Sequence, residues 1–339
     1  MDGSVLLEVK DLEVSFYTKE GEVQAIRKIN YQLKPGEVLG IVGESGSGKS
    51  VSSLCILKLM PEIGKIKNGQ ILFEGKDIIT MSKKEIMELR GNDISMIFQE
   101  PMTSLDPLFT IGYQIDEALK KHTVLDKVQR EKRIIELLEM VGINQPEKRM
   151  KQYPHEFSGG MRQRAMIAMA LCCSPKVLIA DEPTTALDVT TQAQIVDLLK
   201  ELKERLNMAI IFITHDLGVV SDICDKIIVM YAGQIIESGY KRQIFYKNRH
   251  PYTQGLLNSV PKIDLESKEE LVPIEGNPPD MLRIRTGCPF APRCGSRMKI
   301  CVREEPPQVS PEEGHGVSCW LMFKDGQQNT EGEERKGAL

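Results

Sequence analysis

The amino-acid sequence predicts an α/β fold built around a buried parallel sheet, in a chain of more than one domain. Apolar runs at 38–42, 176–181 and 208–214 have the length and composition of buried strands. A helical pattern at 190–206 separates the last two runs, and strands that alternate with helices form parallel sheets. The 339 residues exceed one average domain, so we expect a second unit.

The other elements follow from similar patterns in chain order. The stretch 6–42 alternates apolar runs with turn residues, which predicts hairpins that lead into the first buried strand. Lysine-, glutamate- and leucine-rich residues at 112–141 and small and apolar residues at 161–173 predict helices. Two apolar runs joined by Ala232-Gly233 predict a further hairpin at 226–237.

The composition excludes several classes of protein. Hydrophobic residues make up 41% and charged residues 27%, as in a folded globular chain. The net charge of −4 offers no long-range attraction to nucleic acid or anionic lipid. No apolar run approaches the roughly 18 residues of a membrane span, and the N-terminus lacks a signal-peptide pattern. We therefore expect a cytosolic protein with reduced cysteines that does not bind nucleic acid.

Residues 43–50 match the phosphate-binding pattern G-x-x-x-x-G-K-[ST], with a strand before them and a helix after them. The loop amides and the helix N-terminus would surround the β-phosphate, Lys49 would reach the β- and γ-oxygens, and Ser50 would bind Mg²⁺. A plain glycine- and serine-rich turn is the alternative, which this context disfavours. The predicted nucleoside triphosphate site comprises Gly43, Glu44, Ser45, Gly46, Ser47, Gly48, Lys49 and Ser50.

A second motif places two carboxylates directly after the buried strand at 177–180. Asp181 would hold Mg²⁺ through its water shell, and Glu182 would polarise the water that attacks the γ-phosphate. An acidic pair after a strand can also be only a helix N-cap, so the motif does not decide the function alone. Together with the phosphate-binding pattern, it predicts nucleotide hydrolysis.

A serine and two glycines at the head of a helix form a second anion-binding terminus within residues 157–161. Here the sequence resembles the ATP-binding cassette (ABC) ATPases, although Phe157 and Met161 replace the usual leucine and glutamine of their signature. The resemblance covers about residues 6–255. It implies a RecA-like P-loop core, an antiparallel β subdomain and a helical subdomain at about 100–170. The implied signature residues, which in the family contact the nucleotide of another subunit, are Ser158, Gly159, Gly160 and Met161.

Other motifs of the family follow in order. The implied Q-loop, D-loop and switch histidine are Gln99, Ala186-Leu187-Asp188 and His215. By this resemblance Gln99 would complete the coordination of Mg²⁺ and water, and His215 would stabilise charge on the γ-phosphate. Phe16 would stack on adenine, with Tyr17 as the alternative aromatic residue. The resemblance therefore implies that ATP and Mg²⁺ are bound between two head-to-tail subunits.

Three segments resemble one branch of the family, the oligopeptide/dipeptide importers: residues 102–107, residues 250–257 and the C-terminal cysteines. This closer resemblance covers the chain up to about residue 322. It implies an ATPase subunit that energises peptide import from the cytoplasmic face of the membrane. Its implied partners are two permeases docked on the block after Gln99, a second ATPase subunit and, indirectly, an extracellular peptide-binding protein. Import of nickel or another small solute is an alternative.

Two rival functions differ in class. A soluble cassette ATPase that acts on DNA or ribosomes is disfavoured by the single cassette, by the lack of a long coiled-coil insertion and by the acidic net charge. A GTP-binding switch is disfavoured because the sequence lacks the base-reading motif Asn-Lys-x-Asp.

Half of the eight cysteines lie in one C-terminal stretch, at Cys288, Cys294, Cys301 and Cys319. Nine of the eighteen prolines fall within 261–339, which excludes long helices and central strands there. In a reducing cytosol, clustered thiols favour a metal site over disulfides. The spacing leaves a 4Fe–4S cluster, Zn²⁺ and no metal open, and the cluster binders of this family branch favour 4Fe–4S.

These observations predict three segments. The ABC ATPase domain is expected at 5–255 and a small irregular cysteine-rich domain at 256–322. The polar residues at 323–339 are expected to be disordered.

Overall fold

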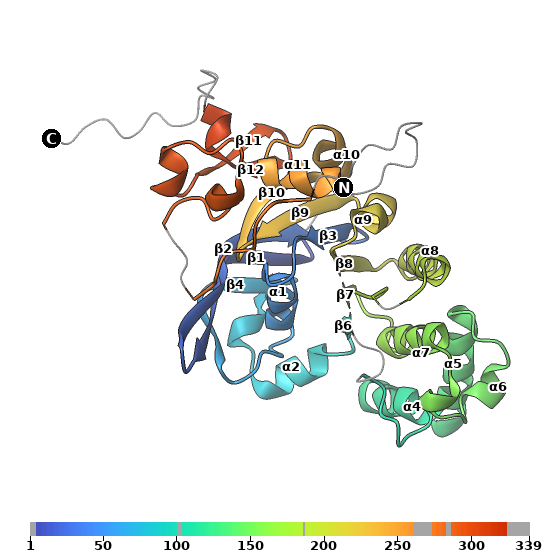
Figure 1. Cartoon of the computed structure of the whole chain (residues 1–339). Helices are drawn as coiled ribbons and strands as arrows, with labels where there is room; N and C mark the ends of the chain where they lie inside the picture. The colour runs from blue at the N-terminus through green and yellow to red at the C-terminus, as the bar shows by residue number, and fades with distance from the viewer. Residues whose placement is uncertain (1–4, 100–103, 186, 260–272, 283–285, 324–339) are drawn as a thin grey trace, which may run out of the picture.

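The structure is a computed structural model, and it describes residues 5–99, 104–185, 187–259, 273–282 and 286–323 (Figure 1). The predictions that concern residues 100–103, Ala186 and 324–339 lie outside these ranges. Within the described ranges, no helix combines the length and the apolar character that a membrane span requires.

The N-terminal hairpin predicted from the sequence is confirmed as part of an antiparallel sheet. Strand β1 (Leu7–Thr18) pairs with β2 (Gly21–Leu33) on one side and with β4 (Gly64–Phe73) on the other. The short strand β5 (Lys76–Asp77) completes the order β2-β1-β4-β5. Buried and exposed residues alternate over much of β1 because successive side chains of a strand point to opposite faces.

The central sheet contains the three buried strands predicted from the sequence. Its order is β11-β12-β10-β9-β3-β8-β7-β6. The bounds are β3 (Val38–Val42), β6 (Ile94–Ile97), β7 (Val177–Asp181), β8 (Ala209–Thr214), β9 (Lys226–Tyr231), β10 (Gln234–Tyr240), β11 (Gln308–Glu312) and β12 (His315–Ser318). Strands β6, β7, β8, β3 and β9 are parallel neighbours. Every residue of β3, β7 and β8 is buried, which explains their continuous apolar sequences.

Helices cover the central sheet and form a separate block at one end of the molecule (Figure 1). The bounds are α1 (Lys49–Ile56), α2 (Lys83–Leu89), α4 (Ile111–His122), α5 (Lys127–Met140), α6 (Pro146–Arg149), α7 (Gly159–Leu171), α8 (Val189–Leu206), α9 (Leu217–Ile223), α10 (Lys241–Tyr246) and α11 (Pro251–Asn258). Thr110 and Asp126 begin α4 and α5 because their side chains accept hydrogen bonds from free backbone amides. Helices α4 to α7 constitute the predicted helical block.

The two faces of the central sheet bury two different cores. Leu39 and Ile41 of β3 contribute to a core shared with α1 and the antiparallel sheet. Val38 and Val42 contribute to the core formed with α7, α8 and α9. Strand β3 is therefore packed on both faces, and this packing fixes the position of the loop that follows it, residues 43–48.

The C-terminal segment contains only short elements, as its prolines predicted, but it is joined to the central sheet. It forms the 3₁₀ turns η3 (Ala291–Arg293), η4 (Ile300–Val302) and η5 (Trp320–Phe323) and the hairpin of β11 and β12. Strand β12 pairs with β10 through Glu237 with Val317 and Ser238 with Gly316. The small irregular domain expected from the sequence thus contains one hairpin, which extends the central sheet.

Candidate active site

The phosphate loop, residues 43–48, joins the carboxyl end of β3 to α1. Gly43 and Gly48 have φ values of 153° and 100°, which side-chain-bearing residues rarely adopt. A Cβ atom on Gly43 would lie 2.2 Å from the carbonyl oxygen of Met230, and one on Gly48 would lie 2.6 Å from that of Ala25. Glycine is thus required both by the backbone conformation and by close packing against the neighbouring strands.

Lys49 holds the phosphate loop through the loop's own carbonyl groups. Its Nζ donates hydrogen bonds to the carbonyl oxygens of Gly43 at 2.8 Å and Glu44 at 3.0 Å, and the residue is 5% exposed. Burial lowers the pKa of this amine, while the charges of Glu182 and Asp181 raise it. The site therefore holds a buried amine beside two carboxylates.

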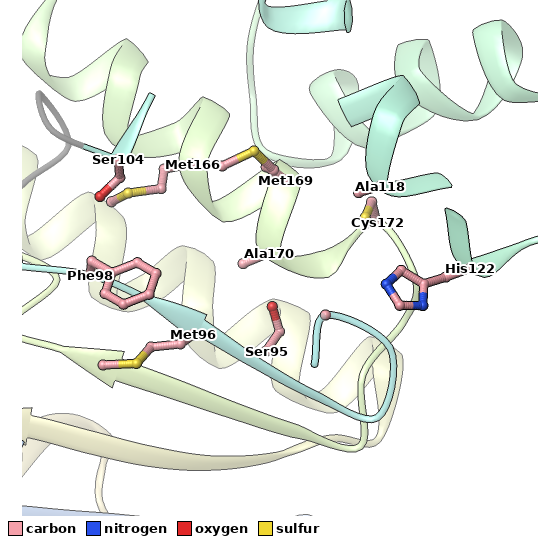
Figure 2. A pocket seen from close by; sticks show the side chains of 11 residues that line it. Ser95, Met96, Phe98, Ser104, Ala118, His122, Met166, Met169, Ala170 and Cys172 are labelled. Atoms are coloured by element: carbon pink, nitrogen blue, oxygen red, sulfur yellow. The ribbon is translucent and has the colours of Figure 1, made fainter. Parts of the chain in front are cut away.

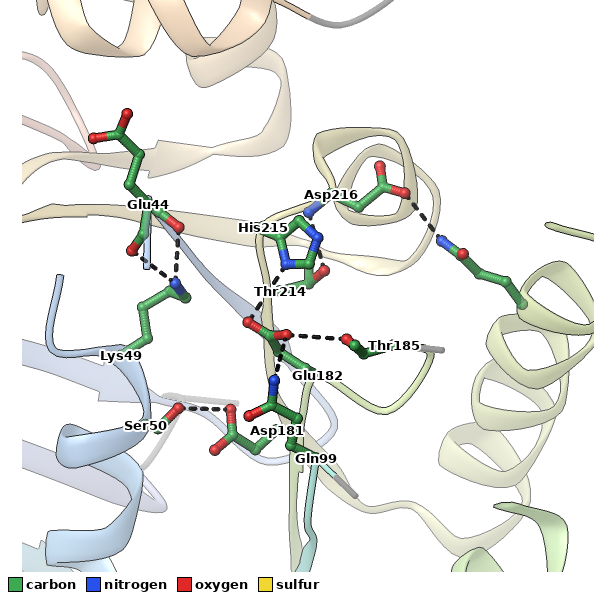
Figure 3. Close-up of polar contacts among 12 residues, drawn as sticks. Glu44, Lys49, Ser50, Gln99, Asp181, Glu182, Thr185, Thr214, His215 and Asp216 are labelled. Carbon is green, nitrogen blue, oxygen red and sulfur yellow. Dashed lines mark hydrogen bonds and ion pairs between the residues drawn. The ribbon is translucent and has the colours of Figure 1, made fainter. Parts of the chain in front are cut away.

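Ser50 and Asp181 supply two adjacent oxygen ligands. The Ser50 hydroxyl donates a hydrogen bond of 3.0 Å to Oδ1 of Asp181, which is 6% exposed (Figure 3). Burial raises the pKa of the Asp181 carboxyl, and the hydrogen bond from Ser50 lowers it. Hydroxyl and carboxylate oxygens are the ligands that Mg²⁺ prefers, so these two residues fit the predicted metal ion.

Glu182 lies at the centre of the predicted catalytic residues (Figure 3). Its Oε2 accepts hydrogen bonds from Nε2 of Gln99 at 3.1 Å and from the hydroxyl of Thr185 at 3.0 Å. Nδ1 of His215 lies 3.4 Å from Oε1. The structure thus brings together Gln99, Glu182 and His215, which come from three different strand ends, and it adds Thr185.

His215 occupies a turn that is fixed while its ring stays exposed. The side chain is 62% exposed. The amide of Asp216 donates to the hydroxyl of Thr214 at 3.0 Å, and Oδ1 of Asp216 accepts from the amide of Gly218 at 2.8 Å at the start of α9. Nε2 of Gln192 donates to Oδ2 of Asp216 at 3.0 Å. This arrangement orients the imidazole toward Glu182 without burying it.

The residues of the signature and the D-loop lie at helix starts. Ser158 begins α7, and its hydroxyl accepts a hydrogen bond from the amide of Met161 at 3.4 Å. Asp188 begins α8 in the same way, through the amide of Thr191 at 2.9 Å. A Cβ atom on Gly159 would meet no atom within 4 Å, so the backbone there is open to another molecule. Their roles in binding the nucleotide of a second subunit stay predictions.

The predicted adenine-stacking residue lies near the end of β1. The ring of Phe16 packs against Gly64, where an added Cβ atom would lie 2.8 Å from Cε1 of the ring. Tyr17 is 43% exposed, and Nζ of Lys65 lies 5.6 Å from its ring centroid. The half-buried Phe16 is held more firmly than Tyr17, and its contact with adenine stays a prediction.

The four C-terminal cysteines are free thiols that influence one another. Burial, with a smaller contribution from the thiols of Cys319, Cys301 and Cys294, raises the pKa of Cys288 to about 12. Among the described residues, no group of three or more histidine, cysteine, aspartate or glutamate side chains is assembled to hold a metal ion. The predicted 4Fe–4S or Zn²⁺ site is therefore not confirmed.

Two contacts to the phosphate loop had no signal in the sequence. The guanidinium of Arg293 binds both carboxylate oxygens of Glu44, at 2.6 and 3.0 Å. The amide of Glu44 donates to the hydroxyl of Tyr252 at 2.9 Å. Tyr252 lies in a motif of the importer branch and Arg293 between two cysteines, but neither pattern indicated a partner in the loop.

One edge of the parallel sheet carries four features of a nucleotide site. They are a phosphate loop, a serine–aspartate pair, a hydrogen-bonded glutamate and a histidine at a strand end. These features define a phosphate-loop ATPase of the cassette type. A family model described as "ABC transporter" matches residues 26–185, and one described as "Oligopeptide/dipeptide transporter, C-terminal region" matches 236–301.

Relatives match nearly the whole chain. The "Oligopeptide transport ATP-binding protein OppD" of Bacillus subtilis is 56% identical over 321 residues, which cover 94% of this chain and 90% of the relative. The protein of the same description from Salmonella typhimurium is 52% identical over 322 residues, covering 95% of each chain. The chain belongs to the ABC transporter family, in its oligopeptide/dipeptide transporter branch.

Solved structures of cassettes share the fold. The dimeric post-hydrolysis state of the ATP-binding cassette MJ0796, bound to ADP and Pi, is 28% identical, with a TM-score of 0.63. The match covers 70% of this chain and 99% of the MJ0796 chain. The protein cbiO1 of Clostridium perfringens, part of the ABC transporter complex cbiONQ, is 32% identical, with a TM-score of 0.61. That match covers 71% of this chain and 90% of the cbiO1 chain. The predicted α/β cassette core is thereby confirmed.

Proposed function

We propose that this chain is the ATP-hydrolysing subunit that energises import of dipeptides or oligopeptides through a membrane ABC transporter. The observation that carries the ATPase assignment is the carboxylate of Glu182, surrounded by Gln99, Thr185 and His215. Peptides are favoured over nickel as cargo because the relatives that match over nearly the whole chain are oligopeptide and dipeptide transport proteins.

The residues of the site divide the chemical work. Mg²⁺, held by Ser50 and Asp181 with Gln99 nearby, would neutralise charge on the β- and γ-phosphates. Lys49 would exchange the carbonyl groups of the loop for phosphate oxygens. Glu182 would accept a hydrogen bond from the attacking water and so polarise it, and His215 would stabilise the charge on the γ-phosphate.

A second ATPase subunit would complete the site. The hydrogen bonds of Ser158 and Asp188 stay within their own helix caps, and the backbone at Gly159 is open. A cassette similar to this one has been solved as a dimer with ADP and Pi. We propose that ATP joins the signature of one subunit to the phosphate loop of the other, and that loss of the γ-phosphate contacts opens the dimer. The partner is a copy or a relative of this chain.

A cavity of about 560 Å³ between the central sheet and the helical block is the proposed docking site of the permeases (Figure 2). Met96 and Phe98 line it from β6 and its end, and Met166 and Met169 line it from α7. Phe98 directly precedes Gln99, which contacts Glu182. An apolar permease segment in this cavity would therefore be coupled to Glu182 through Phe98 and Gln99. The contact would lie at the cytoplasmic face of the membrane. An extracellular peptide-binding protein would deliver the peptide to the permeases.

A tagged chain is expected to co-purify with two integral membrane proteins. Met169→Glu should reduce the recovered amount of both about tenfold, because it places a charge at an apolar contact, while ATP binding is unchanged. Ile63→Glu, at a side chain that is 53% exposed on another part of the molecule, is the matched control. Recovery of ribosomes or DNA in place of membrane proteins from the unaltered chain would refute the transport role.

We propose the limits 5–255 for the cassette, 256–322 for the C-terminal domain and 323–339 for a tail. The two family models match separate segments, 26–185 and 236–301, which supports a division of the chain, although the second match begins before residue 256.

We also propose that Cys288, Cys294, Cys301 and Cys319 hold a 4Fe–4S cluster. The amide of Met298 donates to the sulfur of Cys301 at 3.4 Å. Burial raises the pKa values of the other three thiols, and backbone hydrogen bonds from Phe290, Ser296 and Leu321 offset part of that rise. Such bonds favour the thiolates that a cluster needs. The cluster would cross-link a segment too short to bury a large core.

Protein isolated without oxygen is expected to be brown, with absorbance at about 400 nm from thiolate-bound iron. Cys294→Ser should remove the colour, whereas Cys173→Ser, at a half-buried cysteine outside the C-terminal group, should retain it. A colourless protein that contains one zinc ion per chain would overturn the proposed 4Fe–4S cluster.

A further inference from the structure

We propose that Arg293 is a positioning residue for the ATP site, through which the cysteine segment, residues 287–319, fixes the shape of the phosphate loop. This inference rests on the proposed ATPase function and adds a residue to it. The contact joins parts of the chain that are 249 positions apart.

The contact between Arg293 and Glu44 is bidentate. Nη1 donates to Oε2 at 2.6 Å and Nη2 donates to Oε1 at 3.0 Å. The planar guanidinium matches the two carboxylate oxygens, which makes such a pair directional as well as strong. The Arg293 side chain is 5% exposed and that of Glu44 is 25% exposed, so water competes little for the guanidinium.

The orientation of Arg293 is fixed by its own surroundings. Nε donates to the carbonyl oxygen of Glu275 at 2.9 Å, and Nη2 donates to that of Ile274 at 3.2 Å. The guanidinium carbon lies 5.9 Å from the ring centroid of Tyr231 and 6.0 Å from that of Phe290, within the range of cation–π contacts. The guanidinium is thus a preorganised clamp for the loop carboxylate.

Glu44 is held through its side chain, its amide and its carbonyl. Besides the side-chain contact, its amide donates to the hydroxyl of Tyr252 and its carbonyl accepts from Nζ of Lys49. When Lys49 turns to phosphate oxygens, the bond to the carbonyl is lost. The amide of Ser47 keeps its own hydrogen bond of 3.2 Å to this carbonyl. Arg293 and Tyr252 then hold Glu44 to parts of the chain outside the loop. A loop fixed before binding loses less entropy when ATP arrives, which raises the affinity.

Arg293 also belongs to the turn between two of the clustered cysteines. The amide of Ala291 donates to the carbonyl of Cys288 at 3.0 Å, and the amide of Arg293 donates to that of Phe290 at 3.0 Å. Cys294 follows directly in the chain. Displacement of this turn would therefore displace the clamp on the phosphate loop.

The test measures equilibrium binding of a fluorescent ATP analogue to the full chain and steady-state ATP hydrolysis by the assembled transporter. Arg293→Gln should raise Kd and KM for ATP about tenfold, with kcat changed less than about twofold, because Glu182 and His215 are not touched. Glu44→Gln should have the same effect. The double variant should bind no more weakly than either single variant, since the two residues act as one pair.

Two further variants separate positioning from a general loss of structure. Arg293→Lys, which keeps the charge but loses the fork, should recover part of the affinity. Arg297→Gln, at an exposed arginine of the same segment, should leave Kd unchanged. Unchanged Kd in Arg293→Gln or Glu44→Gln, or additive losses in the double variant, would overturn the inference. If Arg293→Gln does not fold, Glu44→Gln decides. An unaltered chain that does not bind ATP would instead refute the proposed function.

Discussion

Replacement of Glu182 by glutamine is expected to slow ATP hydrolysis by about 100-fold or more while ATP still binds, because a general base contributes about that factor. The amide retains the size of the carboxylate and can still contact Gln99 and Thr185, but it cannot polarise the attacking water. Phosphate release measures hydrolysis, and binding of a fluorescent ATP analogue measures affinity. The variant should also accumulate as an ATP-bound dimer, which size-exclusion chromatography detects.

Glu204→Gln provides the matched control for this experiment. Glu204 is exposed on α8, away from the strand ends that form the site. The substitution is the same as at Glu182, a carboxylate replaced by an amide. Its turnover should equal that of the unaltered chain. Equal turnover in Glu182→Gln would remove Glu182 from the role of base.

Replacement of Lys49 by alanine is expected to lower the affinity for ATP about 100-fold. A charge-assisted hydrogen bond contributes up to about 3 kcal/mol, which corresponds to that factor. The variant also loses the bonds from Nζ to the carbonyl oxygens of Gly43 and Glu44, so the loop becomes less fixed before ATP arrives. Equilibrium titration with a fluorescent ATP analogue measures the change.

Lys120→Ala, at an exposed lysine near the end of α4, controls for the loss of one positive charge. Its affinity should not change. A folded Lys49→Ala variant that binds ATP as tightly as the unaltered chain would contradict the assignment of residues 43–50 as the phosphate loop.

The central sheet could be predicted because its determinants are local. Strands β3, β7 and β8 are buried on both faces, so each appears in the sequence as a continuous apolar run. The meeting of the carboxylates with the histidine has a related physical reason, although the sequence implied His215 only through the family resemblance: Asp181 ends β7, Glu182 follows it, and His215 follows β8. Since parallel strands end at the same edge, residues after neighbouring strands meet in space.

The contacts of the C-terminal segment could not be predicted because their partners are distant in the sequence. Nothing in the residues around Glu44 or Arg293 indicates the other member of the pair. The pairing of β12 with β10 likewise depends on tertiary packing, since β11 and β12 are short and bordered by prolines and glycines. The contact of Thr185 with Glu182 was missed because a threonine three positions after a glutamate has no distinctive sequence pattern.

The four cysteines show how far spacing alone can lead. Their clustering predicted a metal site, and the structure keeps the thiols within electrostatic reach of one another. An assembled ligand group does not follow from proximity, because sulfur atoms must also converge on one point. Sequence spacing encodes the first condition and not the second.

The hairpin of β11 and β12 closes one side of the central sheet, and this has a consequence for any shortened form of the protein. Glu237 of β10 is fully buried, and it accepts hydrogen bonds from the amides of Arg249 and His250 and contacts Nε2 of His315 in β12. A chain that ended before the hairpin would uncover the backbone of β10 and offer an open edge to other chains, which promotes aggregation. Removal of the hairpin is therefore expected to promote association between chains although it removes no residue of the proposed ATP site.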